Sequence, residues 1–98
     1  MFHGDFEFSA QSFGAHRERT LNRARLQLEN DRRYRDQLAR VTTTLQRIFM
    51  RRLQVTRRLD TYAFNVLGAI AQNIRRIHEY ESSMIKKTRT ILMLGSEE

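Results

Sequence analysis

The sequence lacks several residue types on which small folds depend. Its 98 residues include no cysteine, no proline and no tryptophan, and only four glycines. A β-rich fold of this size needs a turn about every ten residues, built with glycine, proline, asparagine or aspartate, so that class is excluded. Without cysteine there is no disulfide framework, no thiol nucleophile and no thiolate zinc site. We expect an all-α chain and, by default, an intracellular location, cytoplasmic or nuclear.

Long apolar runs and targeting signals are also missing. The apolar stretches, such as residues 66–71, fall far short of the roughly 20 residues that span a bilayer. Residues 1–13 have no basic start followed by an apolar run, and Asp5 and Glu7 count against a mitochondrial presequence. We therefore expect no integral membrane insertion.

Arginine and helix-forming residues are present in excess. Lysine and arginine number 18 against 11 acids, a net charge of +7, and 16 of those cations are arginine. The sequence divides into three regions. Residues 1–12 are glycine-containing and rich in phenylalanine, and are predicted to form an irregular head. Residues 13–94 are predicted to be helical, and residues 95–98 to form a frayed tail after a glycine stop.

Apolar residues follow a helical period through the long middle region. At 100° per residue, fifteen of them fall within an arc of about 100°, and their steps alternate three and four. This pattern is typical of a helix packed against other helices. Before residue 33 the stripe weakens, so the first stretch either drifts or packs differently. The residues expected to mediate helix association are Leu38, Val41, Leu45, Ile48, Leu59, Ala63, Val66, Ile70, Ile74 and Ile77.

Whether this region is one helix or several is open. An unbroken helix would run about 120 Å and need a partner to bury its stripe. The chain could turn at residues 30–31, at the threonine run 42–44, where Thr43 and Gln46 fit a capping box, or at Asp60, which could cap a helix starting at Thr61. None of these places has glycine or proline, and the stripe keeps its angle across both the threonine run and Asp60. The pattern favours one long helix over a hairpin or small bundle.

A set of cations shares one line on the same helical wheel. Between Asp36 and Glu79 the only acid is Asp60, against eight arginines. Self-repulsion on this scale is costly unless something neutralises it, although a solvated helix face remains the simplest alternative. Six residues on this line, which also includes Lys87, are the predicted binding site for an acidic partner: Arg33, Arg40, Arg47, Arg51, Arg58 and Arg76.

Three kinds of acidic surface compete as the partner. Nucleic acid would be held through its phosphates without sequence preference, because no recognised DNA- or RNA-reading motif is present. An anionic membrane surface would want aromatic residues beside the stripe, which the chain partly supplies. An acidic protein surface, such as a partner helix rich in glutamate or an acidic filament lattice, needs the fewest extra features. Helix association through the apolar stripe is expected with a second copy of the chain or with another protein. A general nucleic-acid-binding or packaging protein is the first alternative, and peripheral membrane binding is the second.

The four phenylalanines at the start of the chain have two possible roles. Phe2, Phe6, Phe8 and Phe13 can fold back on the helix, or act as docking anchors in the groove of a partner. The sequence leaves both roles open.

The sequence offers little material for catalysis. Its three histidines are isolated, no glycine-rich phosphate loop occurs, and Glu79 and Glu81 are two residues apart and so diverge on a helix. We expect no metal and no cofactor. The sequence predicts a non-enzymatic structural or adaptor protein that associates through its apolar stripe and binds an acidic surface through arginine.

Overall fold

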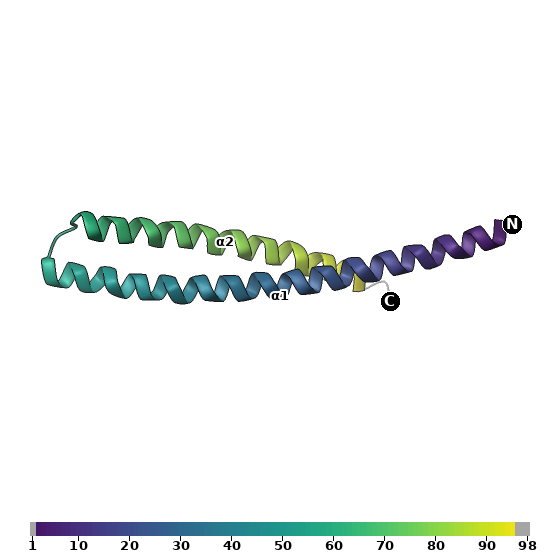
Figure 1. Cartoon of the computed structure of the whole chain (residues 1–98), viewed down its shortest axis with the longest axis horizontal. Helices are drawn as coiled ribbons and strands as arrows, with labels where there is room; N and C mark the ends of the chain where they lie inside the picture. The colour runs from purple at the N-terminus through teal and green to yellow at the C-terminus, as the bar shows by residue number, and fades with distance from the viewer. Residues whose placement is uncertain (1, 96–98) are drawn as a thin grey trace.

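The chain forms an antiparallel pair of helices. The computed structural model describes the backbone of residues 2–95 and the side chains of residues 13–95. Within that part there are two helices and no strand: α1 (Phe2–Thr56) and α2 (Thr61–Gly95). They lie side by side in a rod with extents of 81 × 20 × 14 Å (Figure 1). The all-α fold class is confirmed, and of the architectures left open by the sequence the helical hairpin is the one formed.

The reversal lies at residues 57–60, and the sequence-based preference for one unbroken helix is wrong. Four residues separate the end of α1 from the start of α2. Four residues advance a helical wheel by about 400°, which is one full turn and only about 40° more. The apolar stripe therefore keeps its apparent angle across a real loop, so phase continuity could not reveal it.

The threonine run does not break the helix. The hydroxyls of Thr42, Thr43 and Thr44 donate to the carbonyl oxygens four residues earlier, at 2.6, 2.9 and 3.2 Å. These local bonds let β-branched, hydroxyl-bearing residues sit inside a helix. The capping box proposed for Thr43 is therefore wrong. Residues 30–31, the other candidate break, also lie inside α1.

The helices pack through positions that alternate three and four residues apart. The heptad repeat averages 3.5 residues per turn, so on a wheel drawn at 3.6 the packed face drifts by about 20° per heptad. This drift explains why the stripe weakened before residue 33, although Leu21 and Leu28 do lie in the interface. The shielded positions that follow this spacing are Leu21, Ala24, Leu28, Asp31, Arg35, Leu38, Thr42, Leu45, Phe49, Arg52 and Thr56 on α1, and Ala63, Val66, Ile70, Asn73, Ile77, Tyr80, Met84, Lys87, Ile91 and Leu94 on α2.

The core between the helices is thin. Among the described side chains only four apolar ones are buried, Leu21, Ala24, Ala63 and Ile70, together with the polar Asp31 and Thr42. Most interface positions are half-buried. The hairpin is therefore held by many partial contacts spread along its length.

The two ends of the chain differ from expectation in one respect. The irregular head predicted over residues 1–12 is corrected, because α1 begins at Phe2 and projects beyond the end of α2 (Figure 1). Without proline, an existing helix extends at little cost, since each added residue gains a hydrogen bond with no new nucleation. Phe13 is 69% exposed. At the other end Gly95 closes α2. The side chains of Phe2, Phe6 and Phe8, and the tail residues 96–98, lie outside the described residues.

Candidate functional site

Asp60 starts α2 as its N-cap. Its Oδ1 accepts a hydrogen bond from the N–H of Ala63 at 2.9 Å, and its carbonyl oxygen accepts the first helical bond from the N–H of Phe64, also at 2.9 Å. An aspartate in this position satisfies a backbone donor that the helix itself cannot. The predicted cap at Asp60, with a helix starting at Thr61, is confirmed.

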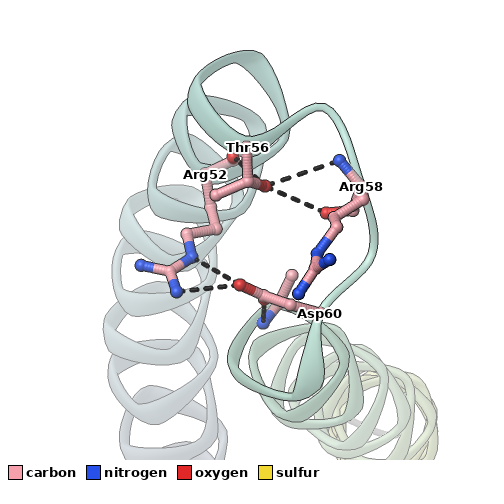
Figure 2. Close-up of polar contacts among 5 residues, drawn as sticks. Arg52, Thr56, Arg58 and Asp60 are labelled. Atoms are coloured by element: carbon pink, nitrogen blue, oxygen red, sulfur yellow. Dashed lines mark hydrogen bonds and ion pairs between the residues drawn. The ribbon is translucent and has the colours of Figure 1, made fainter.

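The same carboxylate ties the end of α1 to the start of α2. Arg52 donates from Nε and Nη2 to Oδ2 of Asp60, at 3.1 and 2.8 Å (Figure 2). The guanidinium carbon also lies 4.8 Å from the ring centroid of Tyr62. The hydrogen bond from Ala63, and then the one from Arg52, lower the pKa of Asp60. The one acid between residues 37 and 78 is thus already occupied.

The loop closes without glycine. Arg57 has a φ of 55°, and its N–H donates to the carbonyl oxygen of Leu53 at 2.8 Å. This left-handed conformation costs a residue with a side chain roughly 1–2 kcal/mol. The Thr56 hydroxyl lies 2.9 and 3.0 Å from the carbonyl oxygens of Arg52 and Arg58 (Figure 2). Arg57 and Arg58 remain exposed at this end of the rod.

Four arginines form a ridge along α1, which we call the arginine ridge: Arg33, Arg40, Arg47 and Arg51. All four are exposed. The first three are one heptad apart, at the position of the repeat that points away from α2. Each heptad step spans about 10.5 Å, and the ridge is about 27 Å long. Within the described residues only Arg33 has a carboxylate within 4.0 Å, that of Glu29 at 3.6 Å, and both of these side chains are 67% exposed.

The remaining predicted cations lie elsewhere. Arg58 is in the loop, and Arg76 is on α2, where it lines a hollow between the helices with Tyr34 and Tyr80. Lys87 points between the helices and pairs with Asp31. The single line of cations predicted from the wheel is therefore corrected, because the reversal at 57–60 gives α2 a different orientation.

The apolar residues predicted for helix association divide into two groups. Six lie between α1 and α2, where they are buried or half-buried: Leu38, Leu45, Ala63, Val66, Ile70 and Ile77. Four remain exposed within the hairpin: Val41, Ile48, Leu59 and Ile74. These four lie on the outer surface of the rod and in its loop.

Two contacts between the helices escaped sequence reasoning. Lys87 and Asp31 form an ion pair whose side chains are mostly shielded from solvent, and the rings of Tyr34 and Tyr80 stack with centroids 5.9 Å apart. Once the loop is known, the heptad pattern places Asp31 and Lys87 at facing positions. That register was the signal that could have revealed the pair.

No family model matches the chain, and neither the curated proteins nor the solved structures yield a significant match. Neither helix, over the part of the chain that the structure describes, contains a segment long and apolar enough to cross a membrane. The same residues contain no group of three histidines or acids placed to hold a metal ion.

Proposed function

We propose that this chain is a non-enzymatic, intracellular structural or adaptor protein, an antiparallel coiled coil that binds an acidic partner helix along the arginine ridge. The observation that carries the proposal is the heptad spacing of Arg33, Arg40 and Arg47 on the exposed side of α1. Arg40 and Arg47 have no carboxylate within 4.0 Å among the described residues, so their charges are available to a partner.

The spacing of the ridge favours a helix over a nucleic acid. A partner helix with glutamate or aspartate at every seventh position presents one carboxylate about every 10.5 Å on a straight line. Phosphates on one strand of a duplex advance about 3.4 Å each along the axis and wind around it. A straight ridge would meet few of them. The planar fork of arginine also binds carboxylates in a two-bond geometry.

The test measures binding of labelled helical peptides by fluorescence anisotropy. One peptide carries glutamate at every seventh position, and an isomer has the same composition in scrambled order. The variant Arg40→Glu/Arg47→Glu should bind the first peptide at least about tenfold more weakly than the original chain at about 50 mM salt, since tenfold corresponds to only about 1.4 kcal/mol. Far-UV circular dichroism verifies that the variant remains helical.

The matched control is Arg75→Glu/Arg89→Glu, which makes the same charge change at two exposed positions of α2. We expect it to lower peptide affinity only slightly. Equal binding of the two peptides, or equal losses in the two variants, would refute the ridge as a helix-binding site.

A general nucleic-acid-binding or packaging role is the second candidate, because the net charge of +7 attracts phosphates in any register. An unrelated DNA duplex is therefore included as a third probe. Tighter binding to the duplex, with the same loss in both double variants, would favour this second role.

A further inference from the structure

An apolar surface extends along the length of the hairpin. It faces away from the plane that contains the two helices. We call it the tyrosine flank: Tyr34, Val41, Ile48 and Val55 of α1, with Tyr62 of α2. The four α1 residues are one heptad apart, and all five are between 38% and 76% exposed. Ile48, Val55 and Tyr62 line one shallow hollow together with Arg51 and Arg52. Tyr34 and Tyr80 line a second hollow, whose border includes Arg76 and Glu79.

The flank carries little charge. Its own positions on α1 are uncharged from residue 34 to residue 55. Of the three bordering residues, Gln37 and Thr44 are polar but neutral, and Arg51 is the cation. Arg33, Arg40 and Arg47 of the arginine ridge point sideways, away from α2, whereas Arg51 lies at the border of the flank. An exposed apolar strip about 32 Å long is more typical of a contact surface than of a solvated one.

We propose that a second copy of the chain covers the tyrosine flank, with α1 packed antiparallel on α1 of the other copy. The two-fold axis then passes close to Thr44. Val41 of each copy faces Ile48 of the other, and Tyr34 faces Val55. The interface is isologous, so the assembly closes as a dimer of two hairpins.

The distribution of charge selects this arrangement among the possible ones. If α1 lay instead on α2 of the other copy, the strip would face Ala69, Arg76 and Ser83, which are less apolar. If the two α1 helices ran parallel, Arg51 would lie beside its own copy. In the antiparallel arrangement Arg51 lies beside Gln37, and no arginine faces another across the strip.

The available area also suits a second copy. The face that carries the strip is about 32 Å long and, over both helices, 20 Å wide, which gives roughly 600 Å² of flat area per copy when the adjoining α2 surface is counted. Interdigitating side chains add to this area. A stable dimer of standard size buries about 800 Å² per partner. The single hairpin buries only four apolar side chains among the described residues, so a dimer would increase the apolar surface that is shielded from water. The proposal does not depend on the binding of an acidic helix by the arginine ridge.

Cysteine crosslinking tests the arrangement directly, because the chain has no cysteine of its own. Under mild oxidation Thr44→Cys should form a disulfide-linked dimer in high yield, since the two thiols meet near the axis. Thr43→Cys is the control. Like Thr44, Thr43 is exposed and its hydroxyl donates to the carbonyl oxygen four residues earlier. The Thr43 side chain, however, points to the opposite side of the hairpin. Equal crosslinking of the two variants would overturn the proposal.

Sedimentation equilibrium of the full chain gives an independent measurement. We expect twice the 11.7 kDa chain mass. The uncharged double variant Val41→Gln/Ile48→Gln should dissociate at least about tenfold more readily while remaining helical. The control Leu67→Gln/Ile74→Gln changes residues that are 39% and 40% exposed on the other side, and it should leave the mass unchanged. A monomer, an assembly larger than two copies, or equal effects of the two variants would contradict this interface.

Discussion

Asp60 shows how much one residue contributes to this fold. Its carboxylate caps α2 through the N–H of Ala63 and holds α1 through Arg52. The chain therefore reverses in a loop that lacks glycine, at a point where one carboxylate contacts both helices. The cap could be predicted from sequence because the capping rule is local. The ion pair with Arg52 could not, because it exists only after the chain has reversed.

Replacing Asp60 should separate these two roles. Asp60→Asn keeps a capping oxygen but loses the charge, whereas Asp60→Ala loses both, so stability near neutral pH should decrease in that order. The folded-state pKa of Asp60 is lowered below 3.8, so the stabilisation by its charge is complete above that pH and is lost as pH falls through the folded value. The difference between the original chain and Asp60→Asn should therefore narrow in acid.

Urea midpoints followed by circular dichroism, at neutral pH and at several values below about pH 4, provide the measurement. Asp36→Asn is the control, because Asp36 is an exposed acid on α1 that caps no helix. A difference between the original chain and Asp60→Asn that stays constant with pH would rule out the charge as its source.

At the scale of the helix, the sequence predicted the type of element but not its limits. A helical wheel drawn at a constant 3.6 residues per turn showed the three–four spacing of the apolar residues and correctly indicated that the helices pack together. It placed Val41 and Ile48 in the association face, although both are exposed in the hairpin, because the real repeat drifts relative to 3.6 residues per turn. It also gave no reason to place Asp31 or Lys87 between helices, since burial of a charge depends on the partner that faces it.

The Asp31–Lys87 pair joins α1 to α2 at facing positions of the interface. Lys87→Met should destabilise the hairpin by about 2 kcal/mol, because it leaves the shielded carboxylate of Asp31 without its cation. The double variant Asp31→Leu/Lys87→Met should recover most of that loss, since an apolar pair fills the same space without a desolvation cost.

Denaturant unfolding of the two single variants and the double variant completes a thermodynamic cycle. Arg33→Met, which breaks the solvent-exposed pair with Glu29, is the control and should change stability by less than about 0.5 kcal/mol. Strictly additive losses for Asp31 and Lys87 would mean that the two charges do not interact.

At the scale of the molecule, the excess positive charge that we propose binds a partner also opposes folding of the free chain. The rod has a thin core and a net charge of +7, and the only acid among residues 37–78 is engaged by Arg52. Two unit charges about 10.5 Å apart in water repel by about 0.4 kcal/mol. The excess of arginine was evident from composition. Its gathering into a ridge on α1 alone could not be read from the sequence, because that required the position of the reversal.

Arg47→Gln should therefore stabilise the free chain at low salt. Arg47 lies one heptad from Arg40 and about 6 Å along the axis from Arg51, so its removal relieves roughly 1 kcal/mol of repulsion, worth several degrees of melting temperature. Added salt should raise the melting temperature of the original chain and reduce this difference, because the Debye length shortens to about 10 Å at 0.1 M. Thermal unfolding by circular dichroism at fixed protein concentration measures both effects.

Arg33→Gln is the matched substitution, because Glu29 already offsets the charge of Arg33. It should stabilise the chain much less. If the two variants behaved alike, or if salt lowered the melting temperature, repulsion along the ridge would not contribute significantly to the stability of the chain.

If Arg47→Gln is both more stable and weaker in binding the heptad-spaced glutamate peptide, the two results have one cause. A partner's carboxylates would neutralise the same repulsion that destabilises the free hairpin, so part of the binding free energy is the relief of that repulsion.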